Sequence, residues 1–441
     1  MTRGALRVFL RALLRIFFRR IELAGLDRLP ADGPAMLVAN HPSTLVDPIL
    51  LLAFAPRPVS FLAKEPVFRM PVIGRAARAL DSIPVYRSMD GADPRRNAET
   101  FARARALLQR GGVLALFPEG TSHDDPRMKP LKSGAARIAL GAASAGEGLA
   151  LSIVPAGLTF TDKGTFRSEV LLAFGPPIAV APAPLSARGE PEPRQVRALT
   201  GQIQAGLDAL VLQAESEGAL GLAAGAEQVL SEGDDSSLAG RVELRQRLLA
   251  GRAWLAVHDP DRLEGLERRL RRHLALLEAA RLEGPGLARL RATTLARGLL
   301  HLLLAPLAAA GVLLHFVAWH AVDRLARRFA RGDQSMQATL KLGLGLALYP
   351  ATWIAAGVAV GLRLGAGAGV LAGVAGLFLA AAAVAFGEGS EPVRTLARAT
   401  RLRLGLPGAL SRLRAERETL RGELLAAAAL IPEDRSRPRV P

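Results

Sequence analysis

Cysteine is absent from this chain of 441 residues, and only two Tyr and three Trp are present. Without thiols the protein can form neither a disulfide nor a thiolate metal site. The few Tyr and Trp side chains offer little surface on which bases could stack, which argues against a nucleic-acid partner. Acidic residues are fewer than basic ones, and the net charge is +17. We therefore expect an anionic partner other than nucleic acid.

Hydrophobic residues, in contrast, make up half of the chain, and the mean hydropathy is +0.23. Three apolar segments, residues 299–322, 340–362 and 366–386, are each long enough to cross a bilayer. Together with the positive charge, they predict an integral membrane protein that binds membrane lipids. A general bias of the sequence toward arginine and alanine can account for part of the charge without any anionic partner.

The N-terminal residues 6–23 have the periodicity of an amphipathic helix. Arginines lie four apart on one face and large apolar residues on another: Arg7, Arg11 and Arg15 against Phe9, Leu13 and Phe17. This pattern is typical of a helix at a membrane interface, with its arginines at the headgroups. Because arginines interrupt the apolar run, the segment does not read as a cleaved signal peptide. The alternative is a basic helix packed on the following domain.

A short polar motif follows the first predicted strand, which spans Ala35 to Ala39. The motif runs from Asn40 to Pro48 and contains His41 and Asp47. An imidazole can accept a proton from an attacking hydroxyl, while a carboxylate on its other nitrogen fixes the tautomer. A histidine before a helix can equally be a cap or a satisfied structural residue.

A second apolar strand, residues 113–117, leads into the turn Pro-Glu-Gly-Thr-Ser at residues 118–122. Backbone amides and hydroxyls in such a turn can hold an anion. Strands and helices alternate at short spacing from residue 25 to residue 215, which predicts an α/β domain with a largely parallel sheet. Functional groups in such domains meet at the carboxyl ends of the strands.

Four motifs in this order resemble the glycerolipid acyltransferase family, over about residues 20–180. They are the block from Asn40 to Asp47, the strand Ile83 to Arg87, the turn Phe117 to Ser122, and the apolar stretch Ile153 to Gly157. The family usually has four residues between its His and Asp, whereas five separate His41 from Asp47. On a regular helix the extra residue would rotate Asp47 by about 100° away from His41. Either the turn is irregular, or the two residues do not pair. The longer spacing is similar to a branch that includes eukaryotic-type glycerol-3-phosphate acyltransferases.

The resemblance implies an O-acyltransferase that uses acyl-CoA or acyl carrier protein as acyl donor. The acceptor would be a hydroxyl of glycerol 3-phosphate or 1-acylglycerol 3-phosphate. His41 would act as general base and Asp47 would orient it, without an acyl-enzyme. Backbone amides after Pro118 or near Ser43 would hold the oxyanion. The acceptor would be placed by Arg87, Glu119, Gly120 and Thr121.

Further cations are secondary candidates for binding phosphate. Lys64 flanks the predicted site, and Lys132 stands at a predicted helix start, where ordinary capping is the alternative. Lys163 and Arg167 follow from the resemblance to the branch with the longer spacing. His123 lies beside two aspartates, but adjacent loop residues rarely converge on one ion. We therefore predict no metal, and no cofactor besides the acyl donor.

Two other functions remain open. One is an acyltransferase for a lysophospholipid, an amino lipid or dihydroxyacetone phosphate. The other is a non-catalytic membrane scaffold that keeps an acyltransferase shell. A serine hydrolase fits less well, because neither Ser43 nor Ser122 lies in a nucleophile-elbow sequence. The sequence indicates neither the chain-length preference nor the oligomeric state.

Five regions are predicted along the chain: an interface helix (1–24), the acyltransferase domain (25–215), a linker with charged helices (216–292), membrane-embedded helices (293–390), and a basic helical tail with a disordered end (391–441). Within the third region, residues 218–235 read as linker, followed by two helices broken near Asp259-Pro260 and Gly284-Pro285. Basic residues flank the first apolar segment on both sides. We therefore predict that it re-enters near Pro306 and Gly311, with the catalytic domain on the cytoplasmic face.

Overall fold

The computed structural model describes residues 3–87, 91, 93–144, 149–187, 189–231, 237–282, 295–405 and 407–430. The chain separates into two compact units. The first includes Met1–Glu215 together with the short segment Asp333–Thr339, and the second includes Ser216–Gly332 and Leu340–Arg437. A segment more than a hundred residues downstream thus belongs to the N-terminal unit.

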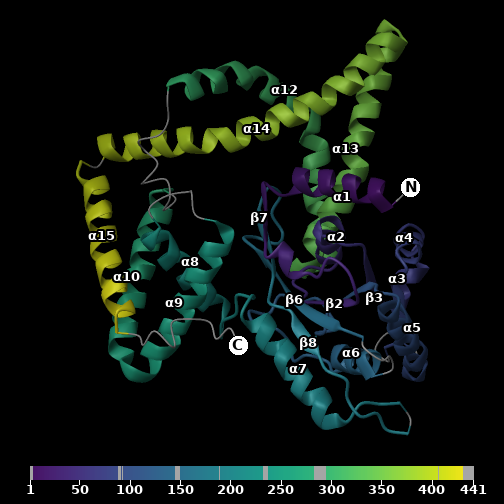
Figure 1. The fold of residues 1–441 in the computed structure, drawn as a ribbon. Coiled ribbons are helices and arrows are strands. Elements are labelled where there is room, and N and C mark those ends of the chain that lie inside the picture. Colours follow the sequence, from purple (N-terminus) through teal and green to yellow (C-terminus); the bar gives the residue numbers. More distant parts are fainter. Residues whose placement is uncertain are drawn as a thin grey trace. The chain divides into compact units, whose positions relative to one another are not determined.

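The first unit is built on a largely parallel sheet, as predicted (Figure 1). Its strands are β1 (Arg20–Ala24), β2 (Ala35–Ala39), β3 (Val59–Lys64), β4 (Ile83–Val85), β5 (Val113–Leu116), β6 (Leu151–Phe160), β7 (Glu169–Phe174) and β8 (Ile178–Val180). The order is β1-β7-β6-β2-β5-β3-β4, with β8 paired to β6. Among these pairs only β6 with β7 and β6 with β8 are antiparallel.

Strand β2 is central and fully buried, as its unbroken apolar sequence requires. It pairs in parallel with β5 on one side and β6 on the other. The register places Val38 beside Leu116 and Ala39 beside Ala156. Because the ends of β2 and β5 coincide, the two polar motifs that follow them leave the sheet at the same edge.

The helices described around this sheet are α1 (Arg3–Phe17), α2 (Val46–Phe54), α3 (Glu65–Arg69), α4 (Ile73–Ala79), α5 (Asn97–Gln109), α6 (Gly134–Ser144) and α7 (Pro193–Asp208). Side chains of α5, α6 and α7 share one hydrophobic core with Met36, Val38 and Leu114 of the sheet. Helices α1 and α2 contact each other and lie on the opposite side of the sheet from α6 and α7 (Figure 1).

The N-terminal helix differs from its prediction in length and orientation. Helix α1 ends at Phe17, and residues 20–24 form β1, which pairs with β7. Arg7 and Arg11 point toward the domain, where they donate to the carbonyls of Ala55 and Ala53 at the C-terminal end of α2. Unpaired carbonyls and the negative end of the helix dipole favour cations at that position.

Helix α1 nevertheless keeps an apolar outer face. Leu10, Leu14 and Phe17 are buried against the domain, whereas Val8 and Ile16 are 67% and 62% exposed. Phe9, the remaining large residue of this face, is 44% exposed. The helix therefore combines the two sequence interpretations, because it packs on the domain and also presents an apolar stripe.

The second unit is helical: α8 (Glu217–Leu230), α9 (Leu238–His258), α10 (Pro260–Ala279), α12 (Leu295–Ala330), α13 (Gln334–Leu364), α14 (Ala366–Gly405) and α15 (Ala409–Ala428). The linker predicted over 218–235 is wrong, since α8 occupies most of it. Ser216 caps this helix, and its Ala226 and Val229 pack against α10 and α15. The break at Asp259-Pro260 is confirmed, whereas Gly284-Pro285 lies outside the described residues.

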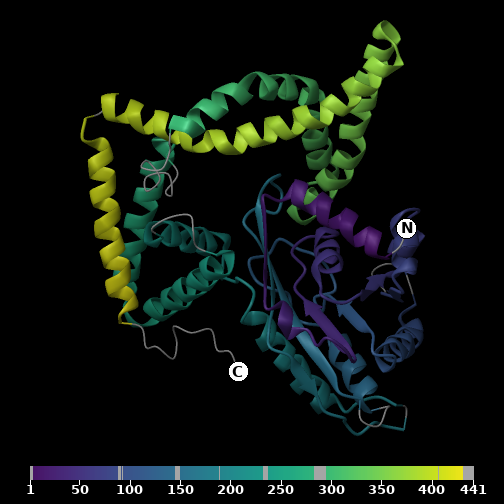
Figure 2. The same cartoon turned by 45° about the horizontal axis from the view of Figure 1, so that its top comes forward.

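Among the residues that the structure describes, three helices are long and apolar enough to cross a membrane, over 303–330, 334–364 and 366–390. The predicted re-entrant hairpin is wrong, because α12 is one continuous, bent helix with Pro306 inside it (Figure 2). Gly311 does not form a turn. It lies where α12 crosses α14, and a Cβ there would approach the Leu379 carbonyl oxygen to 2.2 Å. The tail predicted to begin at 391 also starts later, since α14 continues to Gly405.

Candidate active site

The His41–Asp47 turn begins with an anchored asparagine. The Asn40 side chain donates through Nδ2 to the Leu158 carbonyl at 3.0 Å, and its Oδ1 accepts from the Leu158 backbone amide at 2.7 Å. These two bonds fix the chain where it leaves β2. Residues 41–45 are not helical, and α2 begins only at Val46. The irregular turn absorbs the extra residue, and the His41 Nδ1 to Asp47 Oδ2 distance is 2.8 Å.

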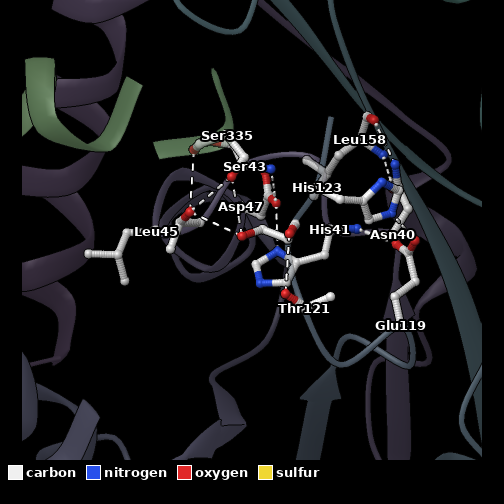
Figure 3. A network of polar contacts seen from close by, with 12 residues as sticks. Asn40, His41, Ser43, Leu45, Asp47, Glu119, Thr121, His123, Leu158 and Ser335 are labelled. Atoms are coloured by element: carbon white, nitrogen blue, oxygen red, sulfur yellow. Dashed lines mark hydrogen bonds and ion pairs between the residues drawn. The ribbon is translucent and has the colours of Figure 1, made fainter. Parts of the chain in front are cut away.

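The surroundings of this pair hold the imidazole in one orientation (Figure 3). The His41 ring stacks on Phe117, with the centroids 4.0 Å apart and an interplanar angle of 12°. Asp47 is fully buried, and its Oδ2 also accepts the Ser43 amide at 2.7 Å. Since Nδ1 faces the carboxylate, Nε2 is the ring nitrogen left to act on a substrate proton.

The charged form of the Asp47 carboxyl is destabilised by its burial. Its Oδ1 is buried and makes no hydrogen bond within the described structure. Burial raises the pKa of the Asp47 carboxyl, and the hydrogen bond and positive charge of His41 only partly oppose that shift. A buried carboxylate of this kind is unfavourable for stability and useful for orienting a histidine.

The Glu119 carboxylate accepts hydrogen bonds from the protein itself, including one from the His41–Asp47 turn. One carboxylate oxygen accepts the His41 amide at 2.8 Å, and the other accepts the Lys129 amide at 2.8 Å and bonds to His123 Nε2. Only 3% of Glu119 is exposed. These contacts correct the acceptor-binding role implied by the resemblance, because protein donors already occupy the carboxylate.

His123 is a site residue whose structural role the sequence reasoning missed. Considered there only as a metal ligand, it instead bonds to Glu119 and orients that carboxylate. The four-residue spacing between Glu119 and His123 was the available signal. It was not decisive, because the two residues lie in a turn and not in a helix.

Two cations converge on Gly120. The Arg87 guanidinium donates to the Gly120 carbonyl, and Lys132 Nζ lies 2.4 Å from the position that a Cβ at Gly120 would occupy. The φ of Gly120 is +75°, which a larger residue rarely adopts. Thr121 follows directly, and its hydroxyl donates to the Ser122 carbonyl at 3.2 Å. The structure thus brings Arg87, Lys132 and Thr121 together at one turn.

The remaining cationic candidates lie at different positions around the site. Lys64 ends β3 and is paired in register with Val85, two residues before Arg87. Lys163 lies near the other end of the site, with Nζ 3.4 Å from an Asp124 carboxylate oxygen. Arg167 lies against α1, and its role as a phosphate ligand stays a prediction. Its guanidinium donates to carbonyls at the C-terminal end of α1, at 3.0 to 3.3 Å.

The amides expected to hold an oxyanion are partly committed elsewhere. Those of Ser43, Thr44 and Leu45 all donate to acceptors within the protein. This contradicts the prediction that amides near Ser43 stabilise an oxyanion. The role of the amides that follow Pro118 in holding the oxyanion stays a prediction.

Fold and site together define a largely parallel α/β domain that holds a His–Asp pair beside a cationic turn. Residues 20–159 match the family model described as Acyltransferase. This part of the chain is therefore similar to that family, and the matched residues include His41, Asp47, Arg87 and the turn at Gly120.

Several known proteins are similar to parts of the chain. A chloroplastic 1-acyl-sn-glycerol-3-phosphate acyltransferase of Arabidopsis thaliana is 36% identical over 123 residues, which is 28% of this chain and 33% of that protein. A glycerol-3-phosphate O-acyltransferase of Saccharomyces cerevisiae is 42% identical over 84 residues, 19% of this chain and 11% of that protein. An uncharacterized acyltransferase of Schizosaccharomyces pombe is 26% identical over 253 residues, 38% of each chain.

A solved 1-acyl-sn-glycerophosphate acyltransferase from Thermotoga maritima is 20% identical, with a TM-score of 0.35, and the match covers 46% of this chain and 76% of that one. The chain spans 38% or less of the three curated relatives described above.

Proposed function

We propose that this protein is a membrane-bound O-acyltransferase. It moves a fatty acyl group from a thioester of CoA or acyl carrier protein to a hydroxyl of glycerol 3-phosphate or 1-acylglycerol 3-phosphate. The observation that supports this most strongly is the 2.8 Å contact between His41 Nδ1 and Asp47 Oδ2 in the acyltransferase domain. The similarity to glycerol-phosphate acyltransferases supports the choice of acceptor.

In the proposed reaction, His41 Nε2 accepts the proton of the acceptor hydroxyl as its oxygen attacks the thioester carbonyl. A carbon–oxygen bond forms, and the tetrahedral intermediate collapses with cleavage of the carbon–sulfur bond. The imidazolium returns the proton to the leaving thiolate, so that ester and thiol are the products. Asp47 holds the imidazole in position and stabilises the imidazolium between the two proton transfers.

The positions of Ser43 and Ser122 support direct transfer without an acyl-enzyme. The Ser43 hydroxyl donates to the Ser335 carbonyl at 3.2 Å, and the Ser122 hydroxyl contacts Thr44 and Ser335. Both serines therefore bond to groups other than His41, so neither is arranged as a serine nucleophile beside its base.

The cations at Gly120 are suited to bind the acceptor phosphate. Arg87 has a planar guanidinium that can contact two phosphate oxygens, and Lys132 adds a point charge on the other side of the glycine. Lys64 and Lys163 lie farther along the same edge and would contribute to the positive potential.

We expect Arg87→Ala to raise the KM for a phosphate-bearing acceptor by about 10-fold to 100-fold, because a charge-assisted contact is typically worth about 1.5 to 3 kcal/mol. The KM for the acyl donor should change less. Steady-state kinetics with 1-acylglycerol 3-phosphate and with its phosphate-free analogue test this. Arg75→Ala, which replaces an exposed arginine of α4, is the control. Equal losses toward both acceptors would contradict the assignment.

An acceptor panel tests the proposed function itself. Purified protein in phospholipid vesicles is given labelled acyl-CoA, or labelled acyl carrier protein, with each of the acceptors named above. Ester formation on glycerol 3-phosphate or its monoacyl derivative is the expected result. Transfer only to lysophospholipid, an amino lipid or dihydroxyacetone phosphate would support the other acyltransferase. No transfer to any acceptor would favour the non-catalytic scaffold.

Attachment to the membrane is proposed to use the three apolar helices and the exposed stripe of α1. The catalytic unit would face the cytoplasm, because basic residues gather near the C-terminal ends of α12 and α14. The short turn between α13 and α14 would then lie on the other side.

Cysteine labelling tests this topology without interference, because the chain has no native cysteine. Ser335, which the sequence alone would suggest as a probe position, is fully buried. The neighbouring Asp333 is exposed, and Leu364 beside the α13–α14 turn is 75% exposed. In intact cells, an impermeant maleimide should label Leu364→Cys and spare Asp333→Cys until the membrane is permeabilised. The reverse pattern would contradict the cytoplasmic placement.

A further inference from the structure

Helix α2, which contains the catalytic Asp47, does not cap its own N-terminus. The residue before the helix is Leu45, whose apolar side chain accepts no hydrogen bond. The amides at the start of a helix have no partner within it and need an acceptor from elsewhere. An uncapped start would loosen the turn that holds Asp47 against His41.

The missing acceptors come from the segment Asp333–Thr339, almost three hundred residues away in sequence. The Leu45 amide donates to the Thr339 hydroxyl at 3.0 Å, and the Thr44 amide donates to the Ser335 carbonyl at 3.1 Å. The Ser43 hydroxyl donates to the same carbonyl at 3.2 Å. Figure 3 shows Ser335 beside Ser43 and Leu45, on the side of the turn away from Glu119.

The same segment also contacts the loop that contains the second motif. The Gln334 amide donates to Asp124 Oδ2 at 2.8 Å, and the Ser335 hydroxyl donates to Ser122 Oγ at 3.3 Å. Ser335 is fully buried by these contacts. The start of α13 is thus bonded to both loops of the site, including residues that lie between His41 and Asp47.

We infer that Asp333–Thr339 is a positioning element of the acyl-transfer site, and that the Thr339 hydroxyl caps the helix that holds Asp47. This inference rests on the proposed function and adds to it a role for the C-terminal region. The match to the family model ends at residue 159, so this capping segment lies outside the matched residues. The capping bonds lie within the first unit, and α13 continues beyond Thr339 as part of the second.

The test is Thr339→Val, which keeps the branched shape and removes the hydroxyl. We expect kcat to fall about tenfold, as for loss of a helix cap that acts on the transition state, with KM changed less than about twofold. Thr339→Ser should restore kcat. The matched control is Thr352→Val in the same helix, because the Thr352 hydroxyl donates to the Leu348 carbonyl within α13.

A double-mutant cycle with Asp47→Asn distinguishes positioning from general destabilisation. If Thr339 acts through the His41–Asp47 pair, Thr339→Val should lower kcat less than about twofold once Asp47 is replaced. Equal losses in both backgrounds, or a Thr339→Val enzyme that behaves like the Thr352→Val control, would overturn the inference.

Hydrogen exchange gives a readout that does not depend on turnover. The Leu45 amide should exchange about tenfold faster in Thr339→Val than in the wild type, and Thr352→Val should leave it unchanged. Unchanged exchange at Leu45 would overturn the capping role. A wild-type protein that transfers no acyl group but shows this exchange difference would contradict the proposed function and leave the capping role intact.

Discussion

His41→Ala should reduce turnover by about 10² to 10⁴, the range typical of a lost general base, while expression and membrane association stay unchanged. The expectation rests on the outward-facing Nε2 of a ring that is fixed by Asp47 and by stacking on Phe117. Initial rates with labelled donor, measured in vesicles that contain equal amounts of wild-type or variant protein, provide the comparison.

The control for this prediction is His258→Ala. His258 lies in α9 of the helical unit and bonds through Nδ1 to the Trp254 carbonyl. It should retain wild-type turnover. A His41→Ala enzyme that keeps more than about a hundredth of the wild-type rate would show that His41 is not the general base.

Asp47→Asn should lower turnover by about 10² or more and leave the protein at least as stable as the wild type. Turnover falls because an amide can hold the wrong imidazole tautomer and cannot stabilise the imidazolium. Stability is maintained because the substitution removes a buried charge whose Oδ1 has no hydrogen-bond partner among the described residues.

The sign of the pH dependence follows from the raised pKa of Asp47. Between the unfolded and the folded pKa, the folded protein binds more protons, so the contribution of this group to stability falls as pH rises through that window. The Asn variant should therefore gain most in thermal unfolding midpoint at neutral pH, and least below the ordinary carboxyl pKa of about 3.9. A variant that loses stability equally at both pH values would contradict the account.

The central strands and their largely parallel arrangement could be predicted from sequence, because the sequence of each strand shows that it is buried. The strand at residues 20–24 was predicted as part of the N-terminal helix. Residues 35–39 and 113–117 are unbroken apolar runs, which buried parallel strands require. The pairing of His41 with Asp47 could not be decided in the same way. It depends on whether residues 41–45 are helical, and the anchor that prevents a regular helix is Asn40 bonded to Leu158, a contact across the sheet.

Other differences between the predictions and the structure also arise from contacts between residues that are distant in sequence. Arg167 and Arg7 are cationic side chains with the spacing or context of ligands, yet each satisfies carbonyls at a helix end that only the fold brings near. Glu119 belongs to a recognised motif, but its burial between two loops could not be inferred from the motif itself. Thr339 gave no sequence signal at all, since its partner amide at Leu45 is distant in the chain.

The central claim, direct acyl transfer with His41 as base, is tested most directly by a single-turnover experiment with excess protein and labelled acyl donor. The account predicts no label on the protein before the acceptor is added, and rapid appearance of labelled ester afterwards in the wild type but not in His41→Ala. Label bound covalently to the protein in the absence of acceptor, or ester formed at the same rate by His41→Ala, would contradict it.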